Sequence, residues 1–165
     1  MSRIWTAKTR RPCGSSIPSR WLAADPAGLR QSRALTNRLI DALGANEGLR
    51  GGKRIPFKVE LADTPEAQAR GLMFRDALGD FEGMIFPSDT PAPRSFWMKN
   101  TPLSLDIIFI GADGRIINIA ANTEPYSLAS VTSKGPAGAV LELRAGRAAA
   151  LGIVPGDRVI YKLPE

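Results

Sequence analysis

The fold is decided by the stretch Leu105–Ala121, which is LDIIFIGADGRIINIAA. It consists of two apolar runs rich in isoleucine, and the dipeptide Asp113-Gly114 lies between them. Because Asp-Gly readily adopts the backbone conformation that a tight turn requires, this pattern favours a β-hairpin with a two-residue turn. β-branched residues are also typical of strands. The stretch therefore predicts two paired antiparallel strands.

The predicted register of this hairpin pairs Ile110 with Ile117 and Ile108 with Ile119. Asp106 then shares a face with these isoleucines, and that face is apolar except for the carboxyl group itself. Since side chains alternate between the two faces of a strand, the apolar face is the better candidate for the core. The register therefore predicts that Asp106 points toward the interior.

A buried carboxylate at Asp106 needs compensation. It requires either a cation or several hydrogen-bond donors, because otherwise its pKa rises and it loses its charge. The candidate cations are Arg75, Arg94 and Lys99. We expect Asp106 either to tie a loop to the sheet through hydrogen bonds or to serve as a site carboxylate at the end of a strand.

Shorter elements surround the hairpin in the sequence. Thr64 and Pro65 predict the start of a helix, and Gly71 predicts its end. In a run of alternating residues, Glu142 lies between two leucines, so it is expected to face solvent. The other predicted elements are strands at 57–61, 140–143 and 159–163, a helix at 145–151, and loops at 87–93 and 123–137. Together they predict a mainly β protein, a sandwich or barrel with two short helices.

The chain divides into two regions of different composition. Residues 1–54 contain 11 Lys and Arg against 3 Asp and Glu, a net charge of +8, so the total of +6 leaves −2 for residues 55–165. We expect a basic, poorly structured extension over 1–54, with a short amphipathic helix at about 29–43, and a single β domain over 55–165. A mis-assigned start codon is the alternative origin of the extension. Because the net positive charge is confined to it, nucleic-acid binding by the domain is not expected.

Missing residue types exclude several classes of function. The chain has no histidine, which excludes histidine-based catalytic triads and zinc sites of cysteine and histidine. Its single cysteine, Cys13, excludes an internal disulfide framework. We predict no cofactor and no metal site. A copper(I) site of three thioethers, from Met73, Met84 and Met98, is the alternative to plain core packing of these residues.

The sequence contains no apolar run long enough for a membrane-spanning helix. No apolar segment follows Arg10-Arg11, as a secretion signal would require. We therefore expect a monomer without a transmembrane segment, located in the cytoplasm by default.

The block Phe96-Trp97-Met98-Lys99-Asn100-Thr101 is the strongest candidate for a binding site. Strand geometry places Trp97 and Lys99 on one face of it. A large aromatic ring flanked by a cation and an amide can stack on a flat ligand and hydrogen-bond to its rim. We therefore predict a non-enzymatic module that binds a small molecule or a protein in a cleft near Trp97. Its candidate ligand-binding residues are Arg75, Trp97, Lys99, Asn100 and Asp106.

Two other functions remain open. A hydrolase or lyase would use Asp106 with Lys99 or Arg75, and its activity would follow the titration of a carboxyl group. The sequence assigns no catalytic residue beyond this pairing. An envelope-associated interaction protein would instead bind an acidic partner or a membrane surface through the basic extension.

Several motifs occur in an order that resembles the bacterial and archaeal family known as domain of unknown function 192. The matching motifs are Gly71-Leu72-Met73-Phe74-Arg75, Gly83-Met84-Ile85-Phe86, the block at 96–101, Leu105–Phe109 and Val140–Leu143. The resemblance covers residues 55–163 and implies a compact β-sandwich, jelly-roll-like domain. It implies no reaction, ligand or catalytic residue. Many members of the family look exported, which implies an envelope location, but this chain lacks the apolar segment of an export signal.

Overall fold

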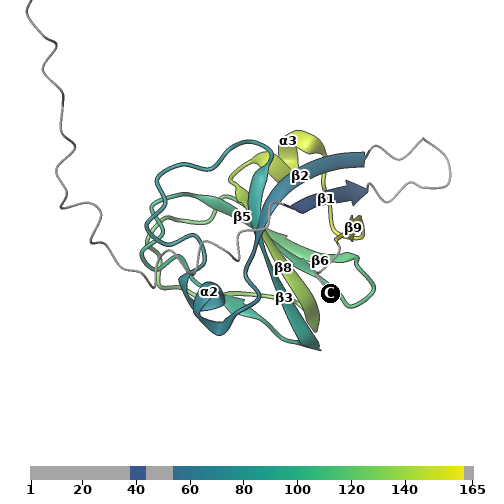
Figure 1. The fold of residues 1–165 in the computed structure, drawn as a ribbon, viewed down its shortest axis with the longest axis horizontal. Helices are drawn as coiled ribbons and strands as arrows, with labels where there is room; N and C mark the ends of the chain where they lie inside the picture. The colour runs from purple at the N-terminus through teal and green to yellow at the C-terminus, as the bar shows by residue number, and fades with distance from the viewer. Residues whose placement is uncertain (1–37, 44–53, 162–165) are drawn as a thin grey trace, which may run out of the picture.

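The computed structural model describes the backbone of residues 38–43 and the complete residues 54–161. Figure 1 shows its elements along the ribbon. In chain order they are β1 (Arg38–Leu43), β2 (Arg54–Leu61), α2 (Pro65–Arg70), β3 (Glu82–Ala92), β4 (Ser95–Phe96), β5 (Leu105–Ile110), β6 (Ile116–Ala120), β7 (Val131–Thr132), β8 (Ala137–Arg144), α3 (Arg147–Leu151) and β9 (Arg158–Ile160). The predicted fold class, mainly β with two short helices, is confirmed. Neither of the described helices is long and apolar enough to cross a membrane.

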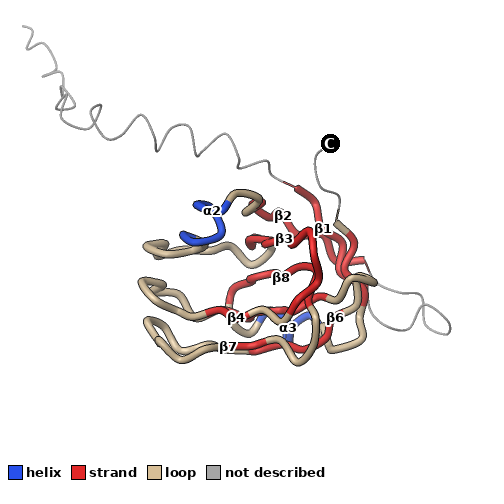
Figure 2. The backbone as a smooth tube through the Cα atoms, turned by 90° about the horizontal axis from the view of Figure 1, so that it is seen from below, coloured by secondary structure: helices blue, strands red, loops and turns tan. Residues whose placement is uncertain are grey.

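Seven strands form one mixed sheet in the order β6-β5-β8-β3-β2-β1-β9, and β4 pairs with β7 in a separate small sheet. The large sheet curls until its two edges approach each other. At that point the N–H of Val159 donates to the carbonyl of Gly114, and the N–H of Ile116 donates to the carbonyl of Asp157, both at 2.8 Å. The edges thus meet at one end without a closed barrel ladder, and these bonds occupy edge groups that would otherwise be open. Figure 2 shows β4 and β7 to one side of β3 and β8.

Apolar side chains cover both faces of the large sheet. The inner cluster lies on the face that includes Phe57 and Leu141, and Ala148 of α3 packs against it. The outer cluster includes Phe86 and Phe109, and an outer layer of α2, β4, β7 and their connecting loops covers it. Figure 1 shows α2 and α3 on opposite sides of the sheet. Because both faces are covered, all six residues of β5 are buried, and all of them except Asp106 are apolar.

The hairpin of β5 and β6 confirms only part of the predicted register. Ile108 pairs with Ile119 as predicted, but Ile110 pairs with Ile116 rather than with Ile117 because a bulge interrupts the ladder. Both backbone groups of Ile116 are hydrogen-bonded to the segment just before β9, where the edges of the sheet meet. This contact comes from far along the chain, so the turn residues did not indicate it.

β1 corrects the helix predicted at about 29–43. Residues 38–43 instead form a strand that pairs antiparallel with both β2 and β9. This pairing satisfies backbone N–H and C=O groups that β2 and β9 would otherwise leave open, a gain that exists only in the assembled sheet. β1 also precedes the domain boundary predicted after residue 54. The rest of the predicted extension, 1–37 and 44–53, lies outside the described residues.

The two helices lie where the sequence predicted, whereas β3 is longer than predicted. The Oγ1 of Thr64 accepts a hydrogen bond from the N–H of Ala67 at 3.1 Å and caps α2. Gly152 ends α3 with a left-handed φ of 72°. The predicted loop at 87–93 is mostly the extended second half of β3, and its register against β8 is irregular because proline cannot donate to a ladder. β7 likewise lies within the predicted loop at 123–137.

Candidate functional site

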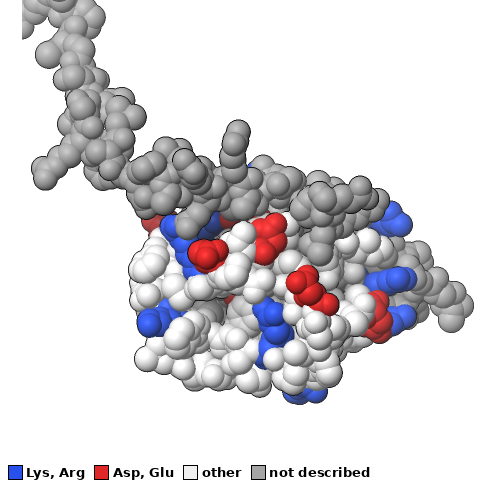
Figure 3. All heavy atoms as spheres, turned by 60° about the horizontal axis from the view of Figure 1, so that its bottom comes forward, with Lys and Arg blue, Asp and Glu red and all other residues white. Residues whose placement is uncertain are grey.

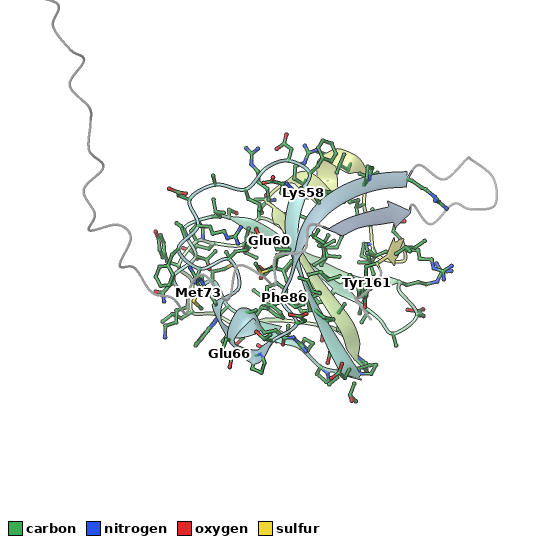
Figure 4. All side chains as sticks on the ribbon, viewed as in Figure 1. Lys58, Glu60, Glu66, Met73, Phe86 and Tyr161 are labelled. Atoms are coloured by element: carbon green, nitrogen blue, oxygen red, sulfur yellow. The ribbon has the colours of Figure 1, made fainter. Side chains whose placement is uncertain are left out.

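A cleft of about 260 Å³ opens beside Trp97 on the side of the sheet covered by the outer layer. α2 and the segment after it contribute one wall, β4 and Trp97 contribute another, and β3 and β8 contribute residues from the sheet. The lining includes Gln68, Met73, Phe86, Arg94, Trp97 and Glu142. In Figure 4, Met73 lies among the loops at one side of the molecule and Phe86 lies nearer the centre of the sheet. The lining thus combines apolar walls with a few polar groups, as in small-molecule sites.

Trp97 is the exposed aromatic group of this cleft, with 51% of its surface accessible. Its chain neighbours anchor it. The ring of Phe96 packs edge-on against Phe86, with centroids 5.1 Å apart, and Met98 is buried. The Nζ of Lys99 lies 5.1 Å from the centroid of the Trp97 ring, in cation–π geometry. Trp97 and Lys99 therefore both lie on the exposed side, and the buried residue between them holds the segment to the core.

Glu142 is a buried carboxyl group in the lining of the cleft, with only 5% of its surface exposed. On the neighbouring strands it lies opposite Met84 and Ile107. Among the residues that the structure describes, no hydrogen bond or ion pair reaches its side chain. Burial raises the pKa of Glu142 from 4.5 to about 8, because the charged form would lose its hydration. At pH 7 the group is therefore mainly a neutral acid.

The prediction that Glu142 faces solvent is wrong. Its alternation with the two leucines is present, since both leucines belong to the inner cluster. The opposite face is not exposed, however, because the outer layer covers it. The nearly unbroken apolar run Ala137–Leu143 was the available signal, since strands buried on both faces have such runs.

Arg94 lines the same cleft and has no carboxylate partner among the described residues. Its guanidinium group donates one long hydrogen bond, 3.4 Å, to the Oε1 of Gln68 and lies 5.9 Å from the centroid of the Phe96 ring. Gln68 is itself held in place, because its Nε2 donates to the carbonyls of Ala62 at 3.1 Å and Pro87 at 3.0 Å. Arg94 and Gln68 also line a neighbouring cleft of about 340 Å³. Most of the donors of Arg94 thus remain available to a ligand.

Asp106 is fully buried, and its carboxylate accepts three backbone hydrogen bonds. Oδ1 accepts from the N–H of Asn122 at 2.9 Å and of Gly146 at 3.1 Å, and Oδ2 accepts from the N–H of Ala148 at 2.9 Å. These bonds join β5 to the segment after β6 and to the start of α3. Among the described residues no ion pair joins Asp106 to any of the three cations considered as its partners. Of the two roles expected for Asp106, this arrangement matches the tie between a loop and the sheet.

The remaining two predicted site residues lie in the loops around the cleft. Arg75 forms a bidentate ion pair with Glu60, in which each terminal nitrogen of the guanidinium group donates to one carboxylate oxygen. Asn100 has a left-handed φ of 55°, its Nδ2 lies 4.0 Å from the Sδ of Met73, and its carbonyl accepts from the N–H of Phe74 at 2.8 Å. The structure therefore brings Asn100 to the wall of the cleft and pairs Arg75 with a partner that the sequence did not indicate.

Neither the surface charges nor the potential metal-binding side chains point to a second candidate site in the described part of the chain. On the face drawn in Figure 3, acidic and basic side chains lie interspersed among uncharged ones. Within residues 54–161, no three histidine, cysteine, aspartate or glutamate side chains gather in a group that could hold a metal ion. The cleft beside Trp97 is therefore the arrangement with the clearest chemical character.

Comparison with known proteins gives one family and several similar solved structures, including the two described below. The family model DUF192, described as "Uncharacterized ACR", matches residues 48–161. A crystal structure of a protein of unknown function from Novosphingobium aromaticivorans is 42% identical, covers 93% of this chain and 99% of its own, and has a TM-score of 0.71. A Sinorhizobium meliloti protein described as a "putative transcription regulator" is 36% identical, with 78% and 95% coverage and a TM-score of 0.72. No curated protein matches the chain.

Proposed function

Since this chain belongs to the DUF192 family, whose description assigns no reaction, we propose its function from its own geometry: it is a module that binds a small molecule in the cleft beside Trp97. The observation that carries this proposal is the combination of a half-exposed tryptophan with a buried carboxyl group, Glu142, that lacks a partner among the described residues. An unpartnered buried carboxyl group lowers stability, and an exposed aromatic ring adds none. Both become favourable when a ligand covers the ring and hydrogen-bonds to the acid.

The dimensions and lining of the cleft support a small, flat or apolar ligand. Its volume, about 260 Å³, lies just below the usual range of ligand sites, which begins near ~300 Å³. Phe96 and Met73 line its apolar wall, and the ring of Trp97 offers a stacking surface. A ligand with one aromatic ring and one polar group fits this description.

The predicted site residues take different roles in this proposal. Trp97 contacts the ligand directly, and Lys99 borders it from the rim, where its Nζ lies over the indole ring. Asn100 and Arg75 hold the loops that carry the walls, through Met73 and Glu60 respectively. Asp106 is a scaffold residue, because its carboxylate is already bonded to three N–H groups.

The test is the fluorescence of Trp97 in the full chain. The chain has three tryptophans, and a Trp5→Phe, Trp21→Phe background leaves Trp97 alone. Benzoate, benzamide and benzylamine serve as probes. At least one is expected to change the emission in a saturable way, and calorimetry of Trp97→Ala is expected to show an affinity about tenfold lower, the size of one aromatic stacking contact.

The matched control is Tyr126→Ala, because Tyr126 is also an exposed aromatic residue, 63% accessible, but does not line the cleft. It is expected to bind the probes as the parent protein does. If no probe binds at millimolar concentration, or if Trp97→Ala binds as well as Tyr126→Ala, the proposed site is wrong.

A further inference from the structure

Two chemically complementary groups in the cleft lack an ion-pair partner among the described residues. Arg94 and Glu142 line the same cavity, and the described ion pairs join other residues. Arg94 and Glu142 also form no ion pair with each other. We propose that the cleft selects a carboxylate ligand, whose oxygens accept hydrogen bonds from the guanidinium group of Arg94 and from the carboxyl O–H of Glu142. This inference rests on the function proposed above, in which Trp97 stacks on the body of the same ligand.

Arg94 is prepared for an anion. A guanidinium group has five N–H donors in a planar fork that matches the two oxygens of a carboxylate. Only one long bond, to Gln68, uses this fork, and the two carbonyl contacts of Gln68 fix the position of its own oxygen. The ring of Phe96 lies beneath the guanidinium group and limits its motion. A ligand carboxylate would therefore meet donors that are already oriented.

Glu142 supplies the second contact only as a neutral acid. In that form it carries an O–H donor that no described group accepts. An O–H donating to a charged oxygen makes a short, charge-assisted hydrogen bond, which is stronger than a bond between neutral groups. A ligand carboxylate therefore gains more from Glu142 than an amide oxygen would.

The charges around the cleft disfavour the opposite choice, a cationic ligand. The titratable groups in its lining are Arg70 at the end of α2, Arg94 before β4, and Glu142 on β8. β3 and β5 present only apolar residues opposite Glu142. Asp63 and Asp89 belong to the lining of the neighbouring cleft. While Glu142 is neutral the lining carries two positive charges, which attract an anion and repel a cation.

The same arrangement makes the affinity depend on pH with a defined sign. Burial raises the pKa of Glu142 to about 8, so the O–H is present below that pH and lost above it. An ionised Glu142 repels a second carboxylate in place of donating to it. The affinity for benzoate is therefore expected to be constant between pH ~6 and ~8 and to fall toward tenfold per pH unit above that. Benzamide has no charge to be repelled, so its affinity is expected to vary less.

The experiment is calorimetry of the full chain with benzoate, benzamide and benzylamine between pH ~6 and ~9.5. Benzoate is expected to bind at least about tenfold more tightly than either other probe at pH 7. Arg94→Gln is expected to remove that preference, whereas Arg158→Gln, an exposed residue of β9 outside the cleft, keeps it. Glu142→Gln retains an N–H donor and cannot ionise, so it is expected to bind benzoate with little dependence on pH.

Different results separate this inference from the function on which it rests. If benzamide or benzylamine binds as tightly as benzoate, and Trp97→Ala weakens that binding, the cleft is a ligand site but the carboxylate proposal is wrong. Tighter binding of benzylamine as pH rises would likewise overturn it in favour of a cation. If no probe binds in a manner that depends on Trp97, both proposals fail. The pH profile of the parent protein decides the matter even if a variant does not fold.

Discussion

Replacing Glu142 by glutamine is expected to stabilise the folded protein at neutral and alkaline pH. Burial raises the pKa of Glu142 from 4.5 to about 8 in the folded state. Between these two pH values the folded state keeps a proton that the unfolded state has released. Stability therefore falls as pH rises through this interval and stays low above it. Glutamine has nearly the same shape and never ionises, so the variant lacks this loss.

The magnitude follows from the difference between the two pKa values. Each unit corresponds to about 1.4 kcal/mol, so the full loss is about 5 kcal/mol above pH 8, and about 3 kcal/mol of it is already present at pH 7. Near pH 4.5 the unfolding free energies of the two proteins are expected to differ only by a term that does not depend on pH. Above pH 4.5 the stability of the variant relative to the parent protein is expected to rise steadily. A gain of this size would be a large part of the stability of a typical domain.

The assay is urea unfolding of the full chain, followed by circular dichroism at pH ~5, ~7 and ~9. The control is Glu124→Gln, because Glu124 is exposed and its removal should leave the pH dependence of stability unchanged. The reasoning is refuted if the difference in unfolding free energy between the parent protein and Glu142→Gln is the same at all three pH values. That result would mean that Glu142 is ionised in the folded protein at neutral pH.

Two further predictions concern the scaffold around the cleft. Asp106→Asn removes one of three hydrogen bonds to a buried carboxylate and weakens the other two, so the unfolding free energy in urea is expected to fall by about 4 kcal/mol. Asp113→Asn, at an exposed turn, should change the unfolding free energy by less than about 1 kcal/mol. Similar losses in both variants would contradict the role of Asp106. Gly83→Ala is expected to destabilise by about 1–3 kcal/mol because a Cβ there would collide with the carbonyl of Glu142, whereas Gly135→Ala has room at 3.8 Å. Equal melting temperatures of these two alanine variants would show that β3 and β8 can separate at this point.

Local chemistry in the sequence was sufficient for several elements. Thr64 marks the start of α2 and Gly71 marks its end, and Asp113-Gly114 joins two isoleucine-rich strands. Both features were predictable because capping and turn formation depend on residues within a few positions of each other. Such features need no knowledge of the rest of the chain, and this is why they could be predicted.

The pattern of short apolar runs and turn residues determined that the protein is mainly β, and the residue types exclude histidine chemistry and an internal disulfide. Only the tertiary structure decided which exposed-looking positions are buried. Glu142 is an acid in an alternating strand, and it becomes a neutral group, without a partner within residues 54–161, only because the outer layer covers that face of the sheet. Residues 38–43 form β1 only because β2 and β9 lie on either side of them. In both cases the deciding energy, desolvation of a carboxyl or pairing of backbone groups, comes from segments distant in the sequence.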